Sequence, residues 1–122
     1  MKSLLISILL LAGCATTPQG KSVELYQYTD IGTTLLATAS DNGIELNPLM
    51  PYIIPLKLYI GKYIDSLPCE QRRSFQKVHN PFFGGLVANN FVVALGAPGI
   101  VIGLLAGTTI AIWQDVPKCE GN

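Results

Sequence analysis

Residues 91–113 read FVVALGAPGIVIGLLAGTTIAIW, and the way in which this segment folds determines the architecture of the chain. By length it could form one helix across a bilayer, which needs about 20 apolar residues. The run GAPG at 96–99 argues against a single helix, because Pro98 removes a helical donor and glycines flank it. We therefore expect a tight turn between two helices, at 74–95 and 100–114. The β-branched residues beside the turn also suit a β-hairpin, which leaves an α+β fold as the alternative.

Two further helices are expected before this pair. Residues 23–40 suit a strand in part, but several apolar side chains fall near helical spacing, and we favour a helix that ends at the Asp-Asn-Gly run 41–43. The predicted fold class is therefore all-α, a small up-and-down helical bundle of about four membrane-associated helices.

The other upstream helix is expected at 47–67. Asn47 is a suitable N-cap, and Pro48 takes the first helical position, where its missing N–H costs nothing. Lys57 and Lys62 interrupt any clean membrane span in this segment. It is either an amphipathic helix at a membrane interface or a helix packed on its neighbours with a solvated lysine edge.

The first residues resemble a bacterial lipoprotein signal peptide. Lys2 precedes an apolar run at 4–11, and Leu11-Ala12-Gly13-Cys14 resembles the lipobox. The resemblance implies cleavage before Cys14 and acylation of its thiol and its new N-terminus by fatty acyl chains such as palmitate. The alternative, an uncleaved membrane helix, needs about 20 apolar residues, whereas polar residues follow Cys14 at once.

This resemblance also implies a domain organisation and a location. Residues 1–13 would be the signal peptide, 14–22 a flexible polar tether, and 23–122 a single helical membrane-associated domain. The mature chain would start on the periplasmic side of the cell envelope, with membrane lipids as its partners. Because Ala15 follows the cysteine where an Asp would retain the protein in the inner membrane, the outer membrane is the favoured address.

Composition restricts the partners of the chain. Hydrophobic residues make up 49% of the 122 residues and charged residues 13%, about half of the usual charged share of roughly 25%. A solvent other than water is therefore expected to cover part of the surface. The formal net charge is zero, which argues against a nucleic-acid partner, since that partner requires a basic surplus.

Cys69 and Cys119 remain once Cys14 carries lipid. In an oxidising compartment an even remainder favours one disulfide, and an up-and-down bundle would bring both cysteines to the end that also holds Cys14. The alternative is a metal pair helped by His79 or Glu70, but no close ligand spacing supports it. We predict a disulfide, no metal, and no cofactor besides the covalent lipid.

Three glycines recur at every fourth position, Gly99, Gly103 and Gly107. In a helix they form a smooth stripe on one face, which allows close approach of another helix. The pattern resembles the glycine zippers of some bacterial envelope lipoproteins. The stripe could pack within this chain, against an envelope protein, or against a second copy.

A second resemblance concerns Asp30, Thr34 and the run Gly43-Ile44-Glu45-Leu46-Asn47-Pro48. It is similar to a family of small polytopic bacterial membrane proteins with no assigned function, although a lipobox is not part of that pattern. The resemblance implies a helical membrane bundle with Asp30, Glu45 and Asn47 as buried polar partners, and intramembrane carboxylates are functional candidates. The alternative for Glu45 and Asn47 is helix capping.

No catalytic motif is found, since His79 has no nucleophile at a recognisable spacing. We therefore expect a protein that is not an enzyme, with a structural or interaction role at the envelope. The alternative is a small membrane-embedded transport or assembly accessory that binds an ion or a polar group through Asp30, Glu45 and Asn47.

Overall fold

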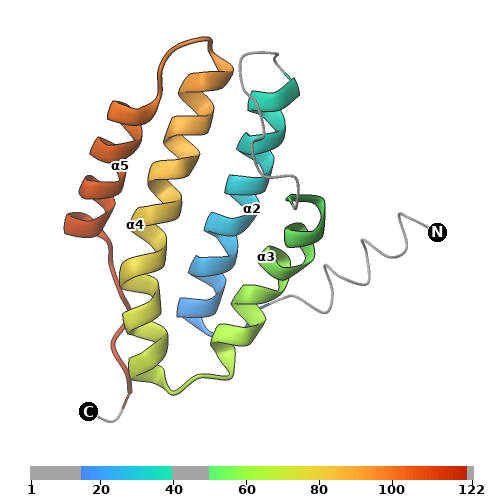
Figure 1. Cartoon of the computed structure of the whole chain (residues 1–122). Helices are drawn as coiled ribbons and strands as arrows, with labels where there is room; N and C mark the ends of the chain where they lie inside the picture. Colours follow the sequence, from blue (N-terminus) through green and yellow to red (C-terminus); the bar gives the residue numbers. More distant parts are fainter. Residues whose placement is uncertain (1–14, 40–49, 121–122) are drawn as a thin grey trace.

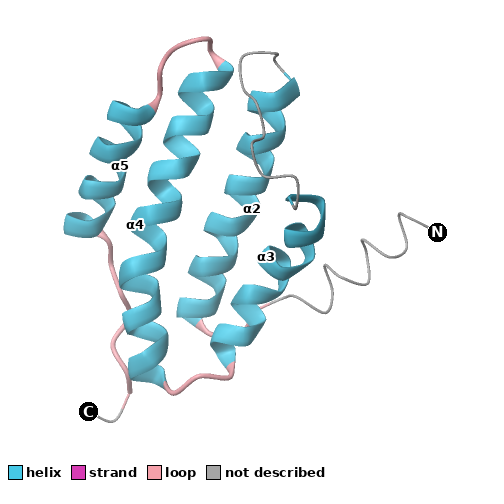
Figure 2. Cartoon of the chain, viewed as in Figure 1, coloured by secondary structure: helices cyan, strands magenta, loops and turns pink. Residues whose placement is uncertain are grey.

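The computed structural model describes residues 15–39 and 50–120. These residues form four helices, α2 (Pro18–Ala39), α3 (Met50–Asp65), α4 (Cys69–Ala94) and α5 (Ile100–Trp113). Figure 1 shows that successive helices run in alternating directions, and the described residues in Figure 2 are helix or loop only. The predicted all-α up-and-down bundle is confirmed. The β-hairpin alternative is wrong, because the residues on both sides of the 96–99 turn are helical.

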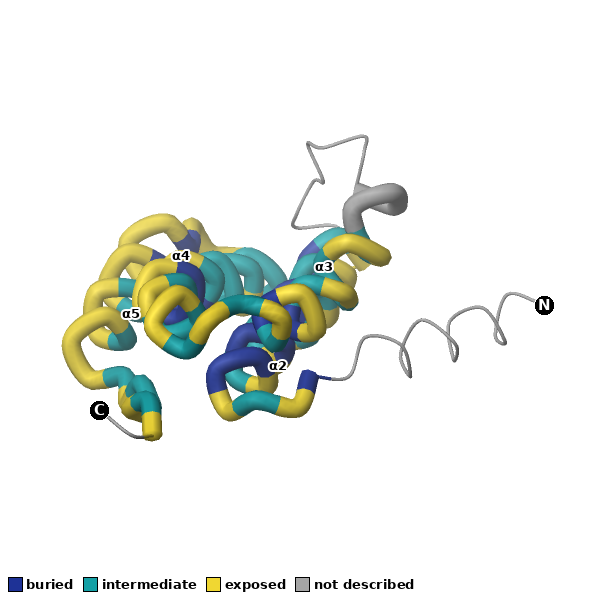
Figure 3. Tube along the Cα trace, turned by 90° about the horizontal axis from the view of Figure 1, so that it is seen from below, coloured by how far each residue is buried: buried dark blue, intermediate teal, exposed yellow. Residues whose placement is uncertain are grey.

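The helices lie in the order α5, α4, α2, α3. Helix α4 packs along both α2 and α5, α2 also packs along α3, and α3 has only a short contact with α4. Seen from below in Figure 3, they form a curved row, with exposed positions running along α5 and the adjoining part of α4. An open row leaves much of each outer helix without a neighbour among residues 15–39 and 50–120.

Helix α2 begins earlier than predicted, which corrects the expected tether at 14–22. The side-chain oxygen of Thr17 accepts a hydrogen bond from the Gly20 amide at 3.0 Å, and Pro18 is the first helical residue. A Thr cap followed by Pro is a favourable helix start, since the cap satisfies a free amide and Pro has none to lose. Residues 15–22 are therefore part of the folded domain.

Helix α4 also begins earlier than predicted, at Cys69 rather than at 74, directly after Pro68. It ends at the expected turn. Gly96 has φ 86°, its amide bonds Val93 O at 2.8 Å, and the Ala97 amide bonds Val92 O at 3.2 Å. This pair of hydrogen bonds is a Schellman motif, which requires the positive φ that glycine adopts without strain. Helix α5 then begins at the predicted residue, Ile100, and ends at Trp113, one residue before its predicted end.

The predicted disulfide is confirmed between Cys69 and Cys119, with the two Cα atoms 5.9 Å apart. It joins the first residue of α4 to the C-terminal segment. Glutamine amides also hold this segment, because Gln19 Nε2 donates to Pro117 O at 3.1 Å and Gln76 Nε2 to Asp115 O at 3.2 Å. The C-terminal residues therefore lie against the starts of α2 and α4.

Burial follows the reverse of the usual pattern. Among the described residues the buried apolar side chains are Ala15, Val23, Ala37 and Ile64, whereas the buried polar ones are Gln19, Glu24, Gln27, Asp30, Gln76, His79 and Asn80. Large apolar side chains are exposed on every helix and most densely on α5. Within the described part of the chain, no helix combines the length and the apolar character that a bilayer crossing requires.

Candidate functional site

A buried ion pair lies where α2, α3 and α4 meet. Asp30 of α2 is 3% exposed, and its Oδ2 pairs with the ammonium group of Lys57 from α3. Asn90 of α4 donates from Nδ2 to Asp30 Oδ1 at 3.3 Å and to the Thr34 hydroxyl at 3.0 Å. A buried carboxylate is stable only when it is paired and hydrogen-bonded. Here one residue from each neighbouring helix meets that requirement.

His79 forms a second polar centre beside this pair. Its ring stacks on Phe83 with centroids 4.4 Å apart, and Lys57 Nζ lies 5.5 Å from the centroid of the same Phe83 ring. His79 Nε2 lies 2.6 Å from Gln27 Nε2, and its Nδ1 lies 3.0 Å from Asn80 Oδ1. With a proton on Nδ1 only, the ring donates to Asn80 and accepts from Gln27, so the neutral imidazole satisfies both contacts.

Burial has a direct effect on the protonation of His79. It lowers the pKa of His79 below the ordinary value of 6.5, because the charged ring would lose its hydration. The hydrogen bond to Asn80 and the charge of Asp30 oppose this shift, and the charge of Lys57 adds to it. The neutral ring therefore predominates at neutral pH.

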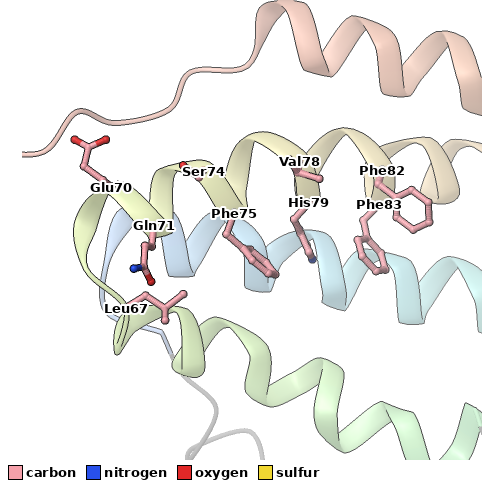
Figure 4. Close-up of a pocket in the computed structure, with 9 residues that line it drawn as sticks. All are labelled: Leu67, Glu70, Gln71, Ser74, Phe75, Val78, His79, Phe82 and Phe83. Atoms are coloured by element: carbon pink, nitrogen blue, oxygen red, sulfur yellow. The ribbon is translucent and has the colours of Figure 1, made fainter.

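A largely apolar groove runs beside His79. Its volume is about 720 Å³, within the range of roughly 300–1,000 Å³ that is usual for small-molecule sites. Figure 4 shows Gln71, Phe75, His79 and Phe83 projecting from α4 towards α3, with Leu67 at the turn between these helices. The groove can accept an apolar group, and its inner wall reaches the polar centre through His79.

Two carboxylates hold the first described residues, and we call this arrangement the N-terminal clamp: Glu24 and Asp65 with the backbone of 15–17. The Ala15 amide donates to Glu24 Oε2 at 2.6 Å. The Thr16 and Thr17 amides donate to the two Asp65 oxygens at 2.6 and 3.0 Å, and both hydroxyls also donate to that carboxylate. The start of the folded chain is thus fixed to the end of α3.

The clamp has its own electrostatic and steric requirements. Partial burial raises the pKa of Asp65, but the hydrogen bonds from Thr16 and Thr17 outweigh it and keep the pKa below the ordinary value of 3.8. Helices α2 and α3 approach through Gly20 and Gly61. A Cβ on Gly61 would lie 2.8 Å from Glu24 Cβ and 2.9 Å from Gly20 O, so any side chain there would push the helices apart.

The predicted glycine stripe faces α4 of the same chain. A Cβ on Gly103 would lie 2.8 Å from Gly85 O, and one on Gly107 would lie 2.8 Å from Pro81 O. A Cβ on Gly99 would lie 2.5 Å from Asn89 O. The backbone of α4 therefore packs directly against the stripe, so the stripe serves helix packing within this chain.

Of the predicted polar set, Asp30 is buried and paired as described, while Glu45 and Asn47 lie outside the described residues, as does Cys14. The sequence did not identify Lys57 and Asn90, which bind the Asp30 carboxylate in the structure. A search of protein-family models finds no match to the chain, and searches of curated proteins and of solved structures find none either.

Proposed function

We propose that the chain is a lipid-anchored protein of the bacterial cell envelope with a structural or interaction role, and that its apolar outer face contacts the membrane. The observation that carries the proposal is the reversed burial, with polar side chains inside and large apolar side chains outside. Large contiguous apolar patches on a protein surface mark contact with a membrane or a protein. A lipid on Cys14 would hold such a patch at the membrane.

Helix α5 is the best candidate for the contact. Its sequence has no charged residue, and Leu104 and Trp113 are 67% and 80% exposed. Transfer of apolar surface from water contributes about 25 cal/mol per Å², so exposure of this face to water is unfavourable. Trp113 lies at the end of the helix, and Trp favours the boundary between lipid and water.

Binding to vesicles tests both parts of the proposal. Labelled palmitate should be incorporated into the wild type and not into Cys14→Ser. Unlipidated Cys14→Ser protein made without residues 1–13, and hence without the apolar run at 4–11, should still float in part with vesicles, and adding Leu104→Glu should release it. Ser66→Glu is the matched control, because it adds the same charge at an exposed position in the turn after α3. No palmitate in the wild type would contradict the anchor, and a fully soluble Cys14→Ser protein would contradict the contact through α5.

The buried Asp30–Lys57 pair favours a second candidate, a membrane-embedded transport or assembly accessory. Reporter fusions at Gly43 and after Asn122 separate the two functions. A cytoplasmic Gly43 with a periplasmic C-terminus supports the accessory and would make Asp30, Glu45 and Asn47 the residues to study. Two periplasmic fusions support the anchored protein, with outer-membrane fractionation as the expected companion result.

A further inference from the structure

The position of the clamp next to Cys14 has a consequence for processing. Ala15 is only 8% exposed, and the amides of Ala15, Thr16 and Thr17 all donate to carboxylates of the folded domain. These are the second, third and fourth residues after the bond between Gly13 and Cys14. The chain just beyond the predicted cleavage site is therefore built into the junction of α2 and α3.

A peptidase needs access to the backbone on both sides of the bond that it cuts, and folded proteins give this access through exposed segments or local opening. With the clamp closed, the amides after Cys14 are already hydrogen-bonded and the Ala15 side chain is covered. Cleavage of the folded precursor would thus require the clamp to open. Asp65 is the last residue of α3. The complete clamp therefore cannot form until α3 has been synthesised, has folded and has docked on α2.

We infer that cleavage before Cys14 precedes closure of the clamp, and that a precursor which folds first is a poor substrate for the signal peptidase. The inference rests on the proposed lipid anchor. In the cleavage step one water is consumed, the Gly13–Cys14 peptide bond breaks, Gly13 gains a carboxylate and Cys14 gains a free amino group. Folding of α3 then fixes residues 15–17, which follow the lipid-bearing residue in the chain, to the junction of α2 and α3.

The test uses the full-length lipidated precursor, purified from cells in which the signal peptidase is inhibited. One sample is folded in detergent before purified peptidase is added, and another is diluted from urea directly into the peptidase. The unfolded sample should be cleaved at least tenfold faster, the factor expected when opening must break one hydrogen bond to a carboxylate. Equal rates in the two samples would overturn the inference.

Variants locate the effect in the clamp. The folded Asp65→Asn and Glu24→Gln precursors should be cleaved about tenfold faster than the folded wild type, whereas Glu70→Gln should match it. Glu70 is the control because it is an exposed carboxylate near the same end of the domain. Hydrogen exchange should show protected amides at 15–17 in the folded wild type, and unprotected amides there would also overturn the inference. If neither sample is cleaved and no palmitate is incorporated, the lipid anchor itself fails.

Discussion

At the scale of single residues, the ion pair between Asp30 and Lys57 is expected to dominate stability. Asp30→Asn leaves the ammonium group of Lys57 buried and unpaired, because the Lys57 side chain is only 16% exposed. Loss of one partner from a buried pair costs about 3–5 kcal/mol. We expect a decrease of that size in the free energy of unfolding, measured by urea titration in detergent with far-UV circular dichroism.

A double variant and an exposed pair serve as controls. The double variant Asp30→Leu with Lys57→Met removes both charges. Its decrease in the free energy of unfolding should be smaller than the sum of the decreases that Asp30→Leu and Lys57→Met cause separately. Glu70 is 63% exposed where it pairs with Arg73, and Glu70→Gln should change stability by less than about 1 kcal/mol. An Asp30→Asn protein as stable as the Glu70→Gln protein would show that the buried pair is unimportant.

His79 should make stability depend on pH. Its pKa is lowered in the folded state from 6.5, so below pH 6.5 the unfolded chain binds a proton that the folded chain does not. The stability that the neutral His79 ring contributes is therefore fully present above about pH 6.5. It is lost as the pH falls towards the folded pKa, with a slope of up to about 1.4 kcal/mol per pH unit. Between pH 7.5 and 5.5, the free energy of unfolding of the wild type should fall by more than that of His79→Gln. Identical differences would argue against burial of a neutral ring.

The candidate site could be predicted only in part from the sequence. The second resemblance implies that Asp30 is a buried polar residue, and in the structure Asp30 is 3% exposed. The sequence places Lys57 either on an amphipathic helix at a membrane interface or on a solvated helix edge, because a lysine in an apolar segment does not show which helix face it occupies. A signal was present in the polar positions 19, 27, 30 and 34 of α2, which fall near helical spacing on the face that meets α3 and α4.

At the scale of the helices, two contacts depend on glycine. Gly61→Ala should separate α2 from α3, and Gly103→Ala should separate α5 from α4, since each new Cβ would lie 2.8 Å from an atom of the neighbouring helix. Overpacking of this kind costs about 1–3 kcal/mol. We expect both variants to unfold at lower urea concentration, and Gly61→Ala also to lose amide protection at 15–17.

Gly32 supplies the matched control for both glycine variants. A Cβ there would meet nothing within 4 Å, and alanine is favoured over glycine in helices by up to about 1 kcal/mol. Gly32→Ala should thus be neutral or stabilising. If it destabilises the protein as much as Gly103→Ala, loss of glycine flexibility rather than close helix approach would be the cause.

Helix identity was more predictable than helix starts. The turn at 96–99 was correct because Gly and Pro leave few options for the backbone. The predicted starts of α2 and α4 lie later than the observed ones, because the local pattern favours a tether at Thr17-Pro18 and a turn at Pro68. Both sites combine a proline with a hydrogen-bonded or covalent contact to a distant segment, which a local pattern does not contain.

At the scale of the whole molecule, the open row of helices could not be deduced from periodicity. Periodicity shows that a helix has two faces, but an apolar face points inwards in water and outwards in lipid. In this chain the polar face of α2 points inwards, towards Lys57 and Asn90. The low charged content of the sequence predicts that something other than water covers part of the surface, and this stays a prediction.

The disulfide links the start of α4 to the C-terminal segment. Its two cysteines lie 50 residues apart in sequence. Closing a loop of that size in the unfolded chain contributes about 3–4 kcal/mol to the free energy of unfolding. Cys69→Ser with Cys119→Ser should lower the free energy of unfolding by that amount. Gln19 and Gln76 still hold the segment through Pro117 and Asp115, so the fold should persist and only amides near the segment should exchange faster. A reductant should shift wild-type unfolding to the same extent and leave the double variant unchanged; a wild type insensitive to reductant would contradict the role of the bond.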